Sequence, residues 1–244
     1  MSREMCYRCF WPKPLCWCSS IHAMETRTRF VFLMHPKEYK QEKAATGRLT
    51  HLCLACSELQ VGIGFDDHDA VQTILSDSTL YPVLLYPGPA AVNLSEGVFD
   101  SKATHGRRLT VFILDATWSL GRKMLKLSPS LQKLPRIMFT PLAPSRFVIK
   151  QQPEPGCLST LEATHELLGV LERAGLDRYA QPDQLLGLFH RMQDFQIRCA
   201  SDPTRSGYRR RPYGLPEARV PRRGRSARRG LIFKGGPALP APTR

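Results

Sequence analysis

Apolar runs and amphipathic stretches alternate along most of the chain. The clearest run, 109–114, consists of apolar or β-branched residues only, which is typical of a strand buried on both faces of a parallel sheet. Other runs predict strands at 29–34, 61–64, 80–86, 136–140 and 147–149. Apolar residues at helical spacing predict helices at 42–60, 67–75 and 118–127, after Ser159, and from Pro182. This alternation predicts an α/β fold with a mostly parallel sheet and flanking helices.

The most informative junction follows the strand at 109–114. Asp115 and Trp118 come directly after this strand, and two cations, Arg122 and Lys123, lie on the helix predicted next. Ligand sites in open parallel sheets gather at the carboxyl ends of the strands. A carboxylate beside an indole and a cationic helix suits chemistry on a polyanion. The structural alternatives are an aspartate that caps the helix, a core tryptophan and a solvated basic face.

Four cysteines lie close together near the N-terminus: Cys6, Cys9, Cys16 and Cys18. Four thiolates bind zinc tetrahedrally, and an all-cysteine site is usually closed and structural. Zinc would supply folding energy that so short a segment cannot obtain from a core. The spacing therefore predicts a zinc knuckle within residues 1–20; free thiols, or a redox pair at Cys6 and Cys9, are the alternatives.

Two further cysteines, Cys53 and Cys56, look like a second pair. Both fall on the apolar face of the helix predicted at 42–60. Free cysteine often behaves as a small buried hydrophobe. We therefore expect both side chains in the core.

The positive charge of the chain is uneven. The formal net charge is +14, and residues 202–244 carry 12 Lys/Arg against 2 Asp/Glu. This segment is rich in Pro and Gly and poor in large apolar residues, which predicts a disordered basic tail that contacts nucleic acid. A tail that only improves solubility is the alternative.

Three parts make up the expected organisation: the knuckle at 1–20, an α/β catalytic domain at 21–201 and the tail at 202–244. No apolar run approaches the roughly 18 residues of a membrane span, and the N-terminus lacks the pattern of a secretory signal. We expect a cytoplasmic protein with no membrane partner, and we predict no protein partner. In that reduced compartment, cysteines bind metal or pack in cores more often than they form disulfides.

The helix after Ser159 has clear start and stop signals. Ser159 and Glu162 have the spacing of a capping box, and Gly175 follows the last apolar position of the helical pattern. A capping box needs no functional explanation, but the N–H groups that it leaves free are also suited to bind an anion.

Seven short motifs occur in order along the chain. They are Cys6-x2-Cys9 through Cys16-x-Cys18, His35-Pro36-x-Glu38, Thr46-Gly47-Arg48-Leu49, Leu85-Tyr86-Pro87-Gly88, Asp115-Ala116-Thr117-Trp118 with Arg122-Lys123, Pro144-Ser145-Arg146, and Ser159-Thr160-Leu161-Glu162-Ala163. Together they resemble the DTW-domain family, the tRNA-uridine aminocarboxypropyltransferases, over about residues 6–199. The chain departs from the family pattern at Ala44-Ala45, where a polar residue is expected, and in the tail.

The resemblance implies a fold and a reaction. The fold is a SPOUT-like knotted α/β core. The reaction transfers the 3-amino-3-carboxypropyl group of S-adenosylmethionine to N3 of a uridine in tRNA and releases methylthioadenosine. The implied partner is tRNA, and the implied cofactors are S-adenosylmethionine as co-substrate and a structural zinc ion.

The resemblance also implies the functional residues. Asp115 is the expected catalytic residue, either as the general base that takes the uridine N3 proton or as a ligand of the cofactor's amino group. Desolvation beside Trp118 would raise the pKa of Asp115 and make it a better base. His35 is expected to line the site. The expected cofactor-binding residues are Thr46, Gly47, Tyr86, Pro87, Gly88, Asp115, Thr117, Trp118, Ser159, Thr160, Leu161 and Glu162. The expected contacts to phosphate, or to the cofactor carboxylate, are Arg122, Lys123 and Arg146.

Two other functions are weighed against this one. A methyltransferase of the related knotted class would use the same cofactor and release S-adenosylhomocysteine. A zinc-knuckle adaptor would bind RNA without binding S-adenosylmethionine. The acidic and aromatic junction at Asp115 and the Gly/Pro loops argue against an adaptor, because binding alone requires no such cluster.

Overall fold

A parallel sheet forms the centre of the molecule. The structure, a computed structural model, describes residues 4–41, 45–97, 104–150, 152 and 156–204. Six strands are paired in the order β2-β1-β5-β3-β6-β4, and all of the pairs are parallel. The strands are β1 Arg29–Met34, β2 Ser57–Val61, β3 Leu80–Leu85, β4 Val92–Asn93, β5 Arg108–Asp115 and β6 Arg136–Met138.

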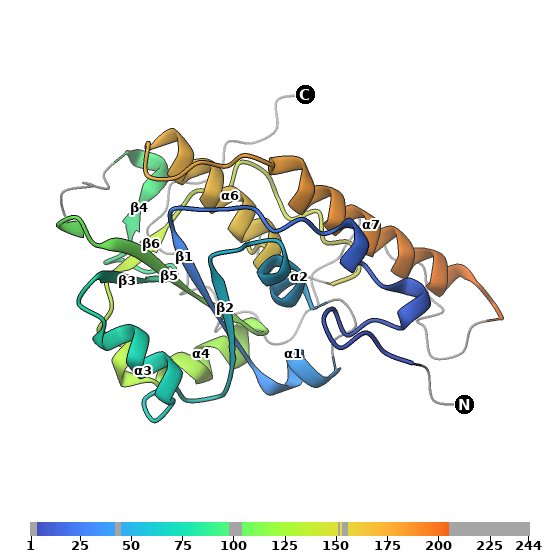
Figure 1. The fold of residues 1–244 in the computed structure, drawn as a ribbon, viewed down its shortest axis with the longest axis horizontal. Coiled ribbons are helices and arrows are strands. Elements are labelled where there is room, and N and C mark those ends of the chain that lie inside the picture. Colours follow the sequence, from blue (N-terminus) through green and yellow to red (C-terminus); the bar gives the residue numbers. More distant parts are fainter. Residues whose placement is uncertain (1–3, 42–44, 98–103, 151, 153–155, 205–244) are drawn as a thin grey trace, which may run out of the picture.

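Helices cover both faces of this sheet (Figure 1). They are α1 Pro36–Gln41, α2 Thr46–Leu52, α3 Asp69–Ser76, α4 Trp118–Lys126, α5 Pro129–Gln132, α6 Thr160–Arg173 and α7 Pro182–Ser201. Alternate residues of each strand point to opposite faces. In β5, Val111 and Ile113 pack with α2, α6 and α7, whereas Phe112 packs with α3, α4 and α5. The expectation of an α/β fold with a parallel sheet is therefore confirmed.

The strand predicted at 109–114 is the centre of the sheet. It lies between β1 and β3, and Val111, Phe112 and Ile113 are almost completely buried. The register pairs Met34 at the end of β1 with Asp115 at the end of β5. The two strands thus end side by side, and the residues that follow them meet at one edge of the sheet.

The helix predicted at 42–60 is wrong in its second half. Helix α2 ends at Leu52, and Ser57–Val61 forms β2, in which Ser57 pairs with Phe30 of β1. Pairing along the edge of β1 outweighs the weak helical spacing, because it supplies hydrogen bonds to a backbone that is only half-buried. Cys53 is in the core as expected, but Cys56 is only partly buried and its thiol donates to Glu25 Oε2.

Two other predicted strands also differ from the structure. The strand predicted at 61–64 contributes only Val61, the last residue of β2. The segment 147–149 is not a strand: Phe147 packs on the ring of Phe189, and Val148 N donates to Gln193 Oε1 at 2.7 Å. Contacts with α7 therefore hold this segment. Pro36, which comes shortly after the strand predicted at 29–34, is the first residue of α1, a position that tolerates proline.

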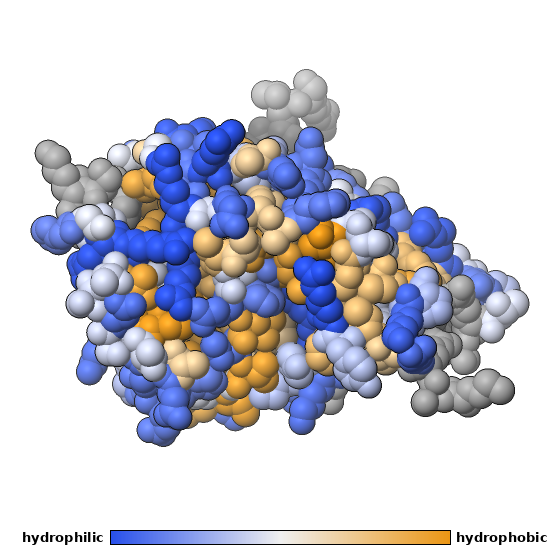
Figure 2. Space-filling view, viewed as in Figure 1, coloured by the Kyte–Doolittle hydropathy of each residue, from blue (hydrophilic) through white to orange (hydrophobic). Residues whose placement is uncertain are grey.

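On the face of the molecule that Figure 2 shows, apolar residues lie mainly across the middle and polar residues lie around the outer parts. Among the described helices, none combines the length and the apolar character needed to cross a membrane. The predicted tail falls almost wholly on residues 205–244, which lie outside the described part of the chain.

Candidate active site and metal centre

The Asp115 carboxyl group lies at the carboxyl end of β5 and is buried, with 5% of the residue exposed. Thr160 Oγ1, in the first turn of α6, donates to Asp115 Oδ1 at 2.5 Å. The other oxygen, Oδ2, is buried and has no hydrogen-bond partner among the described residues. A buried polar atom without a hydrogen-bond partner is energetically costly. Oδ2 is therefore suited to accept a hydrogen bond from a bound ligand. The capping alternative is not realised, since the carboxylate bonds to α6 and not to α4.

Burial raises the pKa of Asp115 to about 6. The hydrogen bond from Thr160 lowers this pKa, while the nearby Glu38 carboxylate raises it. An acid that titrates near neutral pH is suited to take a proton from a substrate. The carboxylate that sequence analysis selected therefore has the electrostatic setting of a general base.

Helix α2 begins directly against this carboxylate. A Cβ atom built on Gly47 would lie 2.3 Å from Asp115 Oδ2 and 2.4 Å from its carboxyl carbon. Only glycine lets the backbone approach so closely. Gly47 therefore lies directly against the Asp115 carboxyl group, and Thr46, the residue before it, is also buried.

Three charged residues near Asp115 were not among the predicted site residues. Glu38 on α1 is buried and forms an ion pair with Lys150 at 3.2 Å. Arg48, the residue after Gly47 on α2, is also buried. The positive charges of Lys150 and Arg48 both lower the pKa of Asp115. Glu38 and Arg48 belong to two of the motifs quoted above. Glu38 is buried although Lys37 and Lys40 on the same helix are exposed, so its burial depends on tertiary packing and leaves no local signal in the sequence.

His35 connects the ends of β1 and β5. Its backbone N–H donates to the carbonyl oxygen of Asp115 at 3.0 Å, and its Nδ1 accepts from the Lys37 N–H at 3.1 Å. Burial lowers the pKa of His35. A neutral ring that holds the start of α1 is consistent with the expected position of His35 at the lining of the site.

An aromatic and basic cluster lies at the neighbouring strand end. The rings of Tyr86 and Trp118 are 6.4 Å apart, and the guanidinium of Arg136 lies over the Tyr86 ring at 5.6 Å. A Cβ atom on Gly88 would lie 3.3 Å from Arg136 Nη1, so the loop after β3 passes close to this side chain. Burial raises the pKa of Tyr86, while Arg122 and Arg136 lower it. The structure thus brings Tyr86, Trp118 and Arg122 together and adds Arg136.

Thr117 lies at the start of α4, next to Trp118 in the chain. It occupies the N-cap position of α4, but its side chain makes no capping hydrogen bond and lies 3.3 Å from the Ser119 hydroxyl. The Thr117 side chain is exposed. It is therefore accessible at the start of α4, beside Trp118.

The side chains at the start of α6 have different roles. The predicted capping box is confirmed: Ser159 Oγ accepts from the Glu162 N–H, and Glu162 Oε2 accepts from the Ser159 N–H. Glu162 also accepts from Ser145 Oγ at 2.8 Å and from the Arg146 N–H at 2.7 Å. Its carboxylate is thus occupied in holding the loop before α6. Leu161 is completely buried in the core, so Thr160 is the residue of this turn whose side chain reaches Asp115.

The three predicted phosphate contacts lie in two places. Arg122 and Lys123 lie on α4, where the charge of Arg122 acts on Tyr86 and that of Lys123 acts on His35. Arg146 is exposed, and its charge acts on His165 and Glu166 of α6. The structure therefore brings Arg122 and Lys123 to the strand ends and places Arg146 beside α6.

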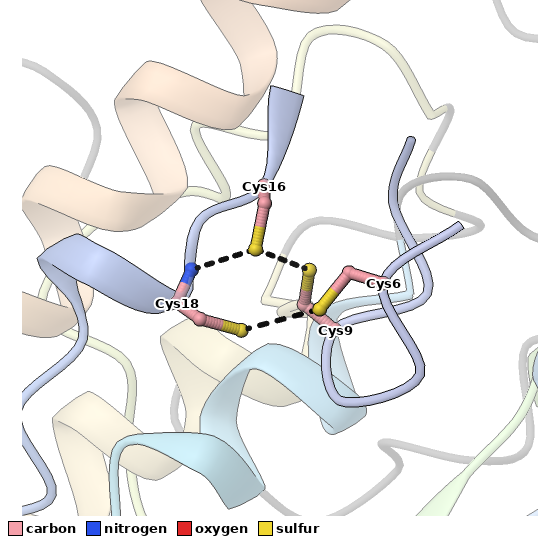
Figure 3. Close-up of side chains that lie close together, drawn as sticks. All are labelled: Cys6, Cys9, Cys16 and Cys18. Atoms are coloured by element: carbon pink, nitrogen blue, oxygen red, sulfur yellow. Dashed lines mark hydrogen bonds between the residues drawn. The ribbon is translucent and has the colours of Figure 1, made fainter. Parts of the chain in front are cut away.

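The four N-terminal cysteines converge on one point (Figure 3). Their Sγ atoms all lie within 4.8 Å of one another, with Cys6 to Cys18 at 3.8 Å and Cys9 to Cys16 at 3.6 Å. Tetrahedral zinc with Zn–S bonds of about 2.3 Å requires sulfur atoms about 3.8 Å apart. Backbone N–H groups of Cys9 and Arg8 lower the pKa of Cys6 to about 6, which favours the thiolate, whereas burial raises the pKa of Cys9 and of Cys18. The cluster therefore has the geometry and the donor set of a structural zinc site.

Comparisons with known proteins identify the family to which this chain belongs. The DTW domain model matches residues 3–197. The tRNA-uridine aminocarboxypropyltransferase 2 of Mus musculus is 30% identical over 209 residues, which is 82% of this chain and 68% of that protein. The protein of the same name from Drosophila melanogaster is 33% identical over 178 residues, 70% of this chain and 67% of that protein. No solved structure matches significantly. The chain belongs to the DTW-domain family.

Proposed function

We propose that this protein is a tRNA-uridine aminocarboxypropyltransferase that uses S-adenosylmethionine as donor and modifies N3 of a uridine. The observation that carries this proposal is the Asp115 carboxylate, which is buried, has a pKa of about 6 and keeps one oxygen without a hydrogen-bond partner among the described residues. It lies at a strand end beside aromatic and cationic side chains. The names of the relatives and the family match support the same reaction.

The proposed chemistry requires a base because uridine N3 is a poor nucleophile until it loses its proton. Asp115 Oδ2 takes this proton, and N3 then forms a bond to the γ-carbon of the donor. The carbon–sulfur bond breaks at the same time, and its electron pair leaves with methylthioadenosine. S-adenosylmethionine supplies an electrophilic carbon activated by its sulfonium. Thr160 holds Asp115 Oδ1 by its hydrogen bond, so the free oxygen keeps one direction.

Two groups of residues are proposed to bind the donor. Thr46, Gly47 and the N-terminus of α6 would bind its amino acid part, because N–H groups at a helix N-terminus favour a carboxylate. Tyr86 and Trp118 would stack on a base, with Gly88 and Pro87 allowing close approach of the backbone. Ser159, Leu161 and Glu162 would then act through the fold of α6, since their side chains cap the helix or pack in its core.

The remaining parts of the proposal concern metal, RNA and fold. Cys6, Cys9, Cys16 and Cys18 would hold a structural zinc ion. Arg122, Lys123 and Arg146, together with the segment 202–244, would contact tRNA phosphates. A SPOUT-like knot is also proposed; the family match and the parallel sheet with helices on both faces (Figure 1) support it. A cytoplasmic location is proposed from the cysteine content and its expected chemistry.

The proposed activity is tested by incubating the full chain with S-adenosylmethionine and unmodified tRNA and analysing the nucleosides by mass spectrometry. We expect aminocarboxypropyl-uridine and an equal amount of methylthioadenosine. S-adenosylhomocysteine with methylated uridine would identify a methyltransferase instead. RNA binding without affinity for S-adenosylmethionine would identify an adaptor.

The role of Asp115 is tested with Asp115→Asn. If Asp115 is the base, kcat falls by about 100-fold or more in the variant. The Kd for S-adenosylmethionine then stays within about twofold of the wild-type value. In the wild-type protein, kcat should rise with pH through about 6, because the ionised carboxylate is the active form. If Asp115 only binds the donor's amino group, Asp115→Asn weakens donor binding and the pH dependence moves to that Kd. Wild-type turnover together with unchanged affinity for S-adenosylmethionine in this variant would exclude both roles.

A further inference from the structure

The loop that carries the cysteines also contacts the helix at the candidate active site. Phe10 follows directly after Cys9 and has a left-handed backbone with φ of 59°. Its N–H donates to the carbonyl oxygen of Cys6 at 2.8 Å, and Cys6 N–H donates to Trp11 at 2.7 Å. These bonds turn the chain back between two cysteines. The direction of the Phe10 ring is therefore set by the same turn that brings the thiols together.

The Phe10 ring lies on the guanidinium of Arg48. The distance from Arg48 Cζ to the ring centroid is 4.1 Å, and the ring of Tyr39 lies 4.6 Å from the same atom. Arg48 also donates from Nη2 to the carbonyl oxygen of Tyr39 at 2.9 Å. Only 6% of Arg48 is exposed. A planar cation held between two aromatic rings and a carbonyl group has one strongly preferred position.

Arg48 belongs to the first turn of α2, directly after Gly47. The backbone at Gly47 touches the Asp115 carboxyl group. A shift of Arg48 would therefore move the turn that lies against Asp115. On its other side, the cysteine loop is fixed to α7, because Trp11 and Trp17 both pack edge-on against Phe195, at 5.3 Å and 6.3 Å. The loop thus bridges a long core helix and the start of α2.

We propose that Phe10 and Arg48 are positioning residues, through which the cysteine loop holds the start of α2 against Asp115 and so shapes the donor site. This inference rests on the proposed activity and adds a role for the loop beyond its own folding. It also implies that loss of metal weakens binding of S-adenosylmethionine, and not only binding of tRNA.

The proposal is tested with zinc-loaded full-length variants by titration calorimetry with S-adenosylmethionine. Phe10→Leu keeps apolar bulk but removes the ring, and it should weaken donor binding by about fivefold or more, the effect of losing about 1 kcal/mol of cation–π interaction. Phe10→Tyr keeps the ring and should bind within about twofold of the wild type. Tyr7→Leu is the matched control: Tyr7 lies on the same loop but is 88% exposed, so donor binding should not change.

A double-mutant cycle separates this coupling from general damage. Phe10→Leu, Arg48→Lys and the double variant should all weaken donor binding to a similar extent, because the two side chains act as one unit. Zinc content and melting temperature are measured on each sample. If Phe10→Leu releases zinc, Arg48→Lys decides alone, since it lies outside the loop. A KM for S-adenosylmethionine that rises while kcat with saturating donor stays near wild type is the expected kinetic split.

Several results would overturn the proposal. They are unchanged donor affinity in zinc-loaded Phe10→Leu or in Arg48→Lys, additive effects in the double variant, or a Phe10→Tyr protein as impaired as Phe10→Leu. Failure of the wild-type protein to bind S-adenosylmethionine would instead refute the proposed function. The two failures are therefore distinguishable.

Discussion

At the scale of single residues, the Asp115 carboxyl group is closely surrounded by α2, α6 and charged side chains. The carboxyl group touches the backbone of α2, accepts one hydrogen bond from α6 and lies among Glu38, Lys150 and Arg48. Burial in this setting makes ionisation of Asp115 costly to the folded protein. The features that suit Asp115 as a base should therefore also lower the stability of the fold.

The cost of ionising Asp115 predicts a pH-dependent effect of Asp115→Asn on stability. The pKa of Asp115 is about 6 in the folded protein, above the ordinary value of 3.8. Between these values the folded state binds more protons, so the free energy of unfolding falls as pH rises and stays lower above pH 6. Asparagine does not ionise. In urea unfolding, we expect Asp115→Asn to be up to about 3 kcal/mol more stable than the wild type at pH 8 and nearly equal to it at pH 4. An equal difference at both pH values would contradict this prediction.

Gly47→Ala tests the close contact between α2 and Asp115. The added Cβ would lie 2.3 Å from Oδ2, so α2 or the carboxyl group must move. We expect a loss of about 1–3 kcal/mol in the free energy of unfolding and weaker binding of S-adenosylmethionine. Gly187→Ala is the control, because its Cβ would meet nothing within 4 Å inside α7. Alanine favours helix there, so this variant should be as stable as the wild type or about 0.5–1 kcal/mol more stable. Equal effects of both substitutions would show that the contact is unimportant.

At the scale of elements, the start of α6 combines a helix cap with a loop anchor. Ser159 caps the helix, while Glu162 both completes the cap and accepts bonds from Ser145 and Arg146. The same turn presents Thr160 to Asp115. Damage to Glu162 should therefore reach the candidate site through the fold of this turn.

Substitutions of Ser159 and Glu162 separate the cap from the anchor. Ser159→Ala should cost about 1 kcal/mol of stability, the usual value of an N-cap side chain. Glu162→Ala should cost more, about 2–3 kcal/mol, because the partly buried hydroxyl of Ser145 and N–H of Arg146 also lose their acceptor. Both costs are measured by urea unfolding. If Glu162→Ala costs no more than Ser159→Ala, the bonds to Ser145 and Arg146 do not contribute.

The elements that sequence analysis predicted well are those fixed by local pattern. The run at 109–114 and the capping box at Ser159 each carry their own signal, and the structure confirms both. The error at 42–60 arose because β2 owes its conformation to pairing with β1, which no local pattern records. Asp115 could be selected from the sequence because it directly follows the run at 109–114. Arg48 and Glu38 were missed because their importance comes from burial beside Asp115, which depends on tertiary packing.

At the scale of the whole molecule, positive charge is concentrated outside the described fold. Residues 202–244 carry 12 of the 35 Lys/Arg residues of the chain. A tail of this composition would add phosphate contacts without adding a site of its own. The folded part would then supply the chemistry, and the tail would supply affinity for RNA.

Deletion of 205–244 should weaken tRNA binding and reduce its dependence on salt. Each phosphate contact adds about 0.7–0.9 to the slope of log K against log salt concentration. We expect the slope to fall by about two units or more, which a filter-binding titration at several KCl concentrations measures. Binding of S-adenosylmethionine should be unchanged. An unchanged slope would show that the tail makes no phosphate contacts.

The position of β5 between β1 and β3 has a consequence for synthesis of the protein. Strands 29–34 and 80–85 leave the ribosome well before residues 108–115, which are their shared neighbour. Until then, both strands expose apolar side chains and unpaired edges, a state prone to aggregate. The nascent chain thus passes through a long interval in which its sheet cannot close. From the strand order alone, we expect a chaperone to bind the nascent chain at this stage. We also expect any fragment that ends before residue 108 to be poorly soluble.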